Sequence, residues 1–192
     1  MNVLLINGSP RKNGNTCYLL NKVITTLTEN GIATELIHLA DKNINGCTGC
    51  FKCAVNKDKK CVIKLDDFNE VFAKMLEADG IIIGSPTYFT DVTTEVKSIL
   101  DRAGAVSFVN DGLFRHKAGA AIIALRRGGG VHAFDTINHM FLMNQMFVVG
   151  STYWNLGFGL NEGDVKNDTE GLANMEDLAN SMAFLLKKIK DQ

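Results

Sequence analysis

Short apolar runs alternate with longer amphipathic stretches along the whole chain, and this alternation constrains the fold more than any other feature. A strand buried on both faces has an uninterrupted apolar sequence, as at Ile81-Ile82-Ile83 and at 120–125. Strands that alternate with helices form βαβ units around a parallel sheet. The sequence predicts five strands, at Asn2–Ile6, Thr34–His38, Gly80–Gly84, Ala118–Leu125 and Met146–Gly150.

Amphipathic segments between and after these runs predict the helices. Leu172, Met175, Leu178 and Met182 recur at helical spacing near the end of the chain, so their apolar stripe should face the core. Gly31 follows the first helix, where a left-handed cap is expected. We expect helices at Asn15–Asn30, Asp66–Ala78, Thr93–Arg102, Val131–Gln145 and Leu172–Ile189, in one domain spanning residues 1–192.

The charge balance excludes some classes of partner. The 192 residues include 20 basic and 21 acidic side chains, for a net charge of −1, so neither nucleic acid nor an anionic membrane surface is an expected partner. Asn144 and Gln145 interrupt the apolar stretch Met140–Gly150, which is too short to span a bilayer. No export signal is recognisable at the start. We expect a soluble, cytoplasmic protein.

Four of the five cysteines lie in one loop, at 45–62, with the spacing C-x2-C-x2-C-x7-C. An odd number of cysteines argues against a disulfide framework and for metal binding or free thiols. A tetrahedral zinc site usually takes one C-x2-C pair and a distant second pair, whereas a short loop with this spacing can wrap a cubane iron-sulfur cluster. Zinc and free thiols remain alternatives. The candidate ligands are Cys47, Cys50, Cys53 and Cys61, and Cys17 is expected to be a small buried residue.

The loop after the first predicted strand, 7–16, is polar and leads directly into a helix. It lacks the G-x-G-x-x-G of a dinucleotide site and the G-K-[ST] of a P-loop. It offers the hydroxyls of Ser9 and Thr16, the cation of Arg11 and the amides of a helix N-terminus. Such a group suits a phosphate monoester. An ordinary turn with a helix cap is the alternative.

Two other predicted strand ends have unusual compositions. A proline and two aromatic residues follow the third strand, and an aromatic ring at that edge can contact a flat heterocycle or pack as core. Three glycines, Gly128–Gly130, follow Arg126 and Arg127 after the fourth strand, and they either admit close approach of a ligand or form a flexible loop. In an open parallel sheet, ligands bind at the carboxyl ends of the strands.

The motifs GSPRKNGNT, GSPTYF and RRGGG, together with the cysteine loop, resemble the iron-sulfur flavoprotein family within the flavodoxin-like, NADPH-dependent FMN reductases. The resemblance implies an α/β, flavodoxin-like three-layer sandwich with a five-stranded parallel sheet in the order 2-1-3-4-5. It implies that FMN lies at the strand ends. The phosphate would be held by Ser9, Arg11, Asn15 and Thr16, and the isoalloxazine ring by Pro86, Thr87, Tyr88, Phe89, Gly128, Gly129 and Gly130.

The same resemblance implies a [4Fe-4S] cluster on the four cysteines and an FMN-dependent oxidoreductase. Electrons would pass between NAD(P)H or ferredoxin and a small acceptor, such as a quinone or an oxygen species, with no catalytic acid or base. A flavodoxin-like electron carrier without its own substrate is one alternative. An FMN reductase whose cysteines bind no cluster is another. A homodimer or homotetramer is expected, with Tyr153 and Trp154 as candidate contact residues.

Overall fold

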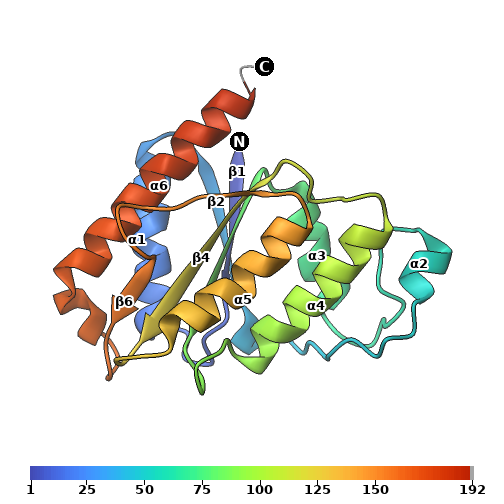
Figure 1. Cartoon of the computed structure of the whole chain (residues 1–192), viewed down its shortest axis with the longest axis horizontal. Helices are drawn as coiled ribbons and strands as arrows, with labels where there is room; N and C mark the ends of the chain where they lie inside the picture. Colours follow the sequence, from blue (N-terminus) through green and yellow to red (C-terminus); the bar gives the residue numbers. More distant parts are fainter. Residues whose placement is uncertain (191–192) are drawn as a thin grey trace.

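A computed structural model describes residues 1–190 and contains one parallel sheet (Figure 1). Its strands run in the order β2-β1-β3-β4-β5, and β6 also pairs with β4. This arrangement confirms the predicted flavodoxin-like strand order, and it adds a sixth strand that the sequence did not predict. The strands are β1 (Asn2–Asn7), β2 (Ala33–His38), β3 (Gly80–Pro86), β4 (Ala118–Leu125), β5 (Phe147–Val148) and β6 (Leu156–Phe158).

Helices cover both faces of the sheet and give three layers (Figure 1). One face is covered by α1 (Asn15–Glu29) and α6 (Thr169–Lys190), which pack against each other. The other face is covered by α3 (Phe68–Glu77), α4 (Thr94–Val109) and α5 (Gly130–Met143). The remaining helical turns are η1 (Leu39–Asp41), α2 (Lys52–Asn56) and η2 (Asp164–Asn167).

The two faces of each central strand are both buried, as the continuous apolar runs predict. In β1, Val3 and Leu5 belong to the core beneath α1 and α6, while Leu4 and Ile6 belong to the core beneath α3, α4 and α5. Successive side chains of a strand point to opposite faces, so a polar residue at any of these positions would enter one of the two cores. This requirement explains why β1, β3 and β4 are easily recognised in the sequence.

The predicted fifth strand, Met146–Gly150, is only partly correct. Its pairing with β4 covers two residues, Phe147 and Val148, and the chain then leaves the sheet and returns as β6. Along this excursion, the buried side chain of Asn155 donates from Nδ2 to the main-chain oxygen of Ala121 at 3.0 Å. A side-chain amide thus replaces a missing strand partner, because a buried carbonyl needs a donor.

Several helix boundaries differ from the predictions by a few residues, and the largest difference is at the end of α4. Gly31 has φ +77° and ends α1 as expected, with the N–H of Ile32 bonded to the oxygen of Leu27. Helix α4 continues to Val109, seven residues beyond the predicted end at Arg102, which is buried rather than terminal. The short helix α2 was not predicted.

Within 1–190, no helix is both long and apolar enough to cross a membrane.

Candidate functional site

A cavity of about 170 Å³ lies at the carboxyl ends of the strands, at the lower end of the sheet in Figure 1. The β1–α1, β3–α4 and β4–α5 loops contribute to it, as does the segment after β6. This is where open α/β sheets bind ligands. Its lining residues are Ser9, Arg11, Gly14, Asn15, Thr16, Pro86, Thr87, Tyr88, Ala124, Leu125, Arg126, Gly159, Leu160 and Glu162.

The β1–α1 loop is held against the β3–α4 loop through Gly8. Its N–H donates to the oxygen of Gly84 at 2.8 Å, and its own oxygen accepts from Thr93 Oγ1 at 2.9 Å. A Cβ at position 8 would lie 2.0 Å from Cγ2 of Val96, so glycine is the residue that permits this approach. The loop is therefore fixed in place before any ligand binds.

The same loop presents donors toward the start of α1. The N–H of Ser9 bonds Asn7 Oδ1 at 3.0 Å, and Ser9 Oγ accepts from the N–H of Arg11 at 3.1 Å. Helix α1 begins after Gly14 with no side-chain cap and no acidic residue in its first turn. Uncapped N–H groups and the helix dipole favour an anion. The exposed side chains of Arg11 and Arg126 add positive charge beside them.

Asn15, predicted to bind phosphate, uses its side chain within the protein. Its Oδ1 accepts from the N–H of Gly163 at 2.9 Å, and its Nδ2 donates to the oxygen of Asn161 at 2.9 Å. The side chain therefore holds the segment after β6 against the cavity. That segment contributes Gly159 and Glu162 to the lining, a contribution that the sequence did not predict because it did not predict β6.

Thr87 supplies a polar group that lacks a partner. Its Oγ1 is buried and makes no hydrogen bond to the described residues, although the residue lines the cavity. A buried hydroxyl without a partner is costly and calls for a ligand or water. The uncapped helix start, the two arginines and this hydroxyl together fit a phosphorylated, polar ligand such as FMN. The cavity is smaller than a typical ligand pocket of about 300 Å³, so it would enclose only part of such a molecule.

A tight turn follows Thr87 and forms one lip of the cavity. Tyr88 and Asp91 exchange main-chain hydrogen bonds of 2.8 and 3.0 Å, and the two residues between them, Phe89 and Thr90, have φ of +45° and +69°. Positive φ is costly for a bulky residue, and such conformations cluster at functional sites. The side chain of Phe89 is fully exposed and does not line the cavity.

The glycines Gly128–Gly130 lie next to the cavity rather than in its lining. Gly129 has φ +82°, and a Cβ there would lie 2.9 Å from Cγ2 of Thr90. This glycine therefore lets the β4–α5 loop pack against the turn at 88–91. Of the eleven predicted FMN contacts, seven line the cavity, while Phe89 and the three glycines adjoin it.

The four cysteines of the loop at 45–62 line a second, small hollow against α4. Cys47 and Cys50 are exposed, and Cys53 and Cys61 are partly buried. Within residues 1–190, no three His, Cys, Asp or Glu side chains converge closely enough for a single metal ion. A cubane has a different requirement, because each thiolate binds a different iron. Four thiols around one hollow are the donor set of a cubane. Cys17 lies elsewhere, buried in α1.

Two asparagines fix the main chain of this loop. Asn69 of α3 accepts from the N–H of Cys61 at 2.9 Å and donates to its oxygen at 2.9 Å. Asn110, at the end of α4, accepts from the N–H of Lys59 at 3.1 Å. The last third of the loop is thus tied to the helices beneath it.

The thiols differ in their readiness to ionise. Hydrogen bonds from the N–H of Lys52 and the hydroxyl of Thr48 lower the pKa of Cys50, whereas burial raises the pKa of Cys53. Metal ligands act as thiolates, so the lowering of the Cys50 pKa is in the direction that metal binding requires.

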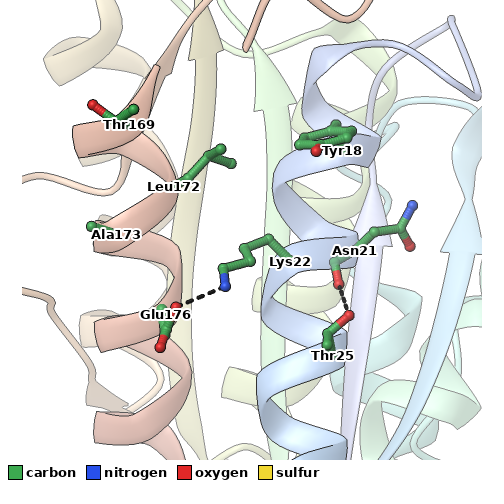
Figure 2. A pocket seen from close by; sticks show the side chains of 8 residues that line it. All are labelled: Tyr18, Asn21, Lys22, Thr25, Thr169, Leu172, Ala173 and Glu176. Atoms are coloured by element: carbon green, nitrogen blue, oxygen red, sulfur yellow. Dashed lines mark hydrogen bonds and ion pairs between the residues drawn. The ribbon is translucent and has the colours of Figure 1, made fainter. Parts of the chain in front are cut away.

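A larger groove, of about 610 Å³, lies between α1 and α6 and has a different character (Figure 2). Its charged residues are paired across it, with Lys22 Nζ 2.7 Å from Glu176 Oε2. The hydroxyl of Thr25 donates to the oxygen of Asn21 at 3.0 Å. This groove lies between helices instead of at the strand ends, and its paired side chains offer little to a ligand.

The strand order and the cavity at the strand ends define a flavodoxin-like α/β protein with a cavity where open sheets of this kind bind ligands. Residues 1–161 match the NADPH-dependent FMN reductase family, and the chain belongs to that family. It is 40% identical to an iron-sulfur flavoprotein of Methanocaldococcus jannaschii, over 99% of this chain and 100% of that protein.

Solved structures share the fold. A flavodoxin, WrbA-like protein from Agrobacterium tumefaciens superposes with a TM-score of 0.66 at 12% identity, over 97% of this chain and 98% of that one. A flavone reductase superposes with a TM-score of 0.77 at 19% identity, over 99% of this chain. The present chain spans 64% of that longer structure. At such low identity, these matches support the fold alone.

Proposed function

We propose that this chain is an FMN-dependent oxidoreductase whose cysteine loop holds a [4Fe-4S] cluster. It would pass electrons between NAD(P)H or ferredoxin and a small acceptor such as a quinone or an oxygen species. The observation that carries the proposal is the gathering of all four loop cysteines around one hollow, in a chain of the FMN reductase family. The iron-sulfur flavoprotein that matches the full chain supports the same assignment.

The chain's own residues would mainly bind and orient FMN. The phosphate would lie at the start of α1, against the main-chain N–H groups of 15–17 and beside Arg11 and Arg126. Ser9, Thr16 and the unpartnered hydroxyl of Thr87 would bond the polar part of the cofactor. The ring would extend toward Tyr88 and the glycines at 128–130.

Bound FMN supplies two-electron acceptance and one-electron release, which joins a hydride donor to a one-electron carrier. No side chain is assigned as acid or base, because positioning and hydrogen bonding to the ring are the protein's main contributions. Cys47, Cys50, Cys53 and Cys61 would ligate the cluster.

The proposal predicts about four irons and four sulfides per chain in protein purified without oxygen, beside one FMN. A Cys53→Ala variant should lose most of the iron and the broad absorption beneath the flavin bands. Cys17→Ala is the matched control, because Cys17 is buried in α1 and should not bind iron. Iron and sulfide assays and the anaerobic visible spectrum measure both results. Wild-type protein with FMN but without iron would instead identify an FMN reductase whose cysteines bind no cluster.

An electron carrier without its own substrate is a second candidate, favoured by apolar side chains on the surface. Phe51 and Val55, in the cysteine loop, are 75% and 81% exposed, and Leu65 is 94% exposed. Such side chains suit contact with a protein partner such as ferredoxin. Steady-state turnover of NAD(P)H with a quinone supports the enzyme. Flavin bleaching by reduced ferredoxin, but not by NAD(P)H, supports the carrier.

We further propose that the chain forms a homodimer or homotetramer through the excursion between β5 and β6. Tyr153 and Trp154 are 62% and 50% exposed there, and large exposed aromatic residues are typical of interfaces. Light scattering after size exclusion should give a multimer for the wild type and a smaller species for Tyr153→Ser/Trp154→Ser. An unchanged mass in that variant places the interface elsewhere.

A further inference from the structure

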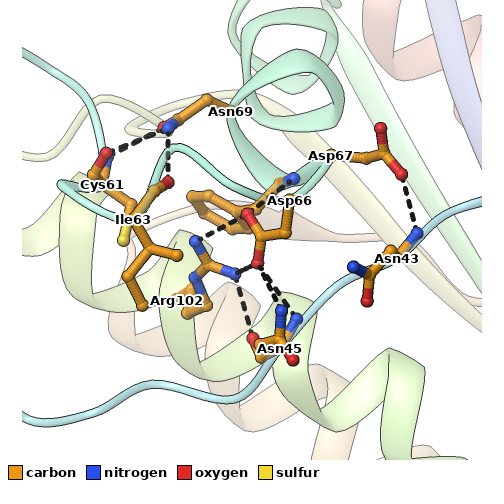
Figure 3. Close-up of polar contacts among 9 residues, drawn as sticks. Asn43, Asn45, Cys61, Ile63, Asp66, Asp67, Asn69 and Arg102 are labelled. Carbon is orange, nitrogen blue, oxygen red and sulfur yellow. Dashed lines mark hydrogen bonds and ion pairs between the residues drawn. The ribbon is translucent and has the colours of Figure 1, made fainter.

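A buried ion pair lies directly beneath the cysteine loop (Figure 3). The side chain of Arg102, on α4, is 1% exposed, and that of Asp66 is fully buried. Arg102 Nη1 bonds Asp66 Oδ2 and also donates to the oxygen of Asn45 at 2.9 Å, while Nη2 donates to Asp66 Oδ1 at 3.3 Å. Both terminal nitrogens of the guanidinium are therefore used within the protein.

The third nitrogen of this guanidinium, Nε, takes part in none of these hydrogen bonds. Arg102 Nε is buried and has no hydrogen-bond acceptor among the described residues. The ring of Phe68 covers one face of the group, with Cζ 4.0 Å from the ring centroid, and no acceptor is available on that side. A buried charged donor without a partner is expensive, so the fold must gain something from placing it here.

The remaining edge of Arg102 is on the side of the cysteines. Arg102 lines the same hollow as Cys47, Cys50, Cys53 and Cys61. Figure 3 shows Cys61, held by Asn69, beside the guanidinium. Cys61 is therefore the candidate acceptor for the free Nε–H.

We propose that Arg102 is a positioning residue that donates its Nε–H to the thiolate of Cys61 and thereby raises the reduction potential of the cluster. This inference rests on the proposed cluster. Reduction adds an electron to the cluster, and a hydrogen bond to a ligating sulfur stabilises the more negative state. Because Asp66 balances the charge of Arg102, the effect comes from the directed N–H bond and not from net charge.

The test removes the donor without leaving a buried charge. The double variant Asp66→Leu/Arg102→Met replaces the pair with apolar side chains, an exchange that buried ion pairs often tolerate. In anaerobically purified protein, we expect the ratio of reduced to oxidised cluster at a fixed potential to fall about tenfold. For a one-electron couple this corresponds to about 59 mV. A redox titration followed by the electron paramagnetic resonance signal of the reduced cluster measures it.

Two further variants separate this role from a structural one. Arg102→Lys keeps a cation beside Asp66 but has no Nε–H, so its potential should shift in the same direction even if the double variant does not fold. Asn110→Ala frees the same loop at Lys59 and leaves the bonds between Asn69 and Cys61 in place, so the ratio of reduced to oxidised cluster at a fixed potential should stay within about twofold of the wild-type value. An unchanged potential in an iron-loaded Arg102 variant overturns the inference. Wild-type protein without iron overturns the proposed cluster itself.

Discussion

Asp66→Asn should destabilise the fold by about 3–5 kcal/mol at pH 7, because it leaves the charge of Arg102 buried and uncompensated. The substitution preserves the shape of the side chain but removes its charge from a pair that is almost completely buried. Urea denaturation followed by circular dichroism measures the change. The matched control is Asp101→Asn, which breaks the half-exposed Lys97–Asp101 pair on the same helix and should cost about 0.5 kcal/mol or less.

The same variant has a predictable pH dependence. Burial raises the pKa of Asp66, but hydrogen bonds from Arg102 and from the N–H of Asn45 outweigh it, and the pKa lies below its ordinary value of 3.8. A lowered pKa means that the carboxylate stabilises the fold above pH 3.8 and that this contribution is lost as the pH falls through the folded-state value. The difference between wild type and Asp66→Asn should therefore shrink in acid. A constant difference between pH 7 and pH 3 would contradict this account.

Gly8→Ala should destabilise the protein by about 3 kcal/mol and greatly reduce FMN loading. Its Cβ would lie 2.0 Å from Val96 Cγ2 and 3.0 Å from the oxygen of Gly84, and overpacking of this kind costs about 1–3 kcal/mol. The displaced loop carries Ser9 and Arg11 with it. Thermal denaturation and the flavin content of purified protein measure the two effects.

A second substitution tests whether the clash itself is the cause. Val96→Ala removes the nearest atom, so Gly8→Ala/Val96→Ala should be less destabilised than the sum of the single variants by about 1 kcal/mol or more. Gly150→Ala is the control for a glycine in an open loop, since nothing lies within 4 Å of its Cβ position. Additive effects of the substitutions at 8 and 96 would mean that the clash with Val96 is not what destabilises the Gly8→Ala variant.

The sequence predicted the parts of the fold that depend on local pattern. The continuous apolar sequences of β1, β3 and β4 and the glycine after α1 were sufficient to locate those elements. The fifth strand was harder to predict. The segment Met146–Gly150 has the sequence of a single strand, but β5 pairs with β4 only at Phe147 and Val148, and pairing with β4 resumes eight residues later in β6. In the sequence, Asn155 has nothing to distinguish it from other loop residues, and only the structure shows its bond to Ala121. Pairing between distant segments leaves little trace in composition.

The residues of the candidate site also divide into those that a local sequence pattern predicts and those that depend on contacts between distant segments. Loop residues such as Ser9, Arg11 and Thr87 follow predicted strands directly, so their place at the cavity could be predicted from the sequence. Gly159 and Glu162 reach it only because Asn15 ties their segment to α1, a contact between residues almost 150 positions apart. The predicted helix ends at Arg102, whereas in the structure this residue lies inside α4 with its side chain buried. Charged residues are seldom buried, and only the pairing with Asp66 explains its position.

The interruption between β5 and β6 also bears on aggregation. A long, regular strand at the border of a sheet offers a continuous row of free N–H and C=O groups, onto which another chain can add. Here that border consists of two- and three-residue strands separated by an excursion, so no long row is presented beside β4. A deletion that straightened 149–155 into one continuous strand would remove this protection from a chain whose central strands are almost entirely apolar.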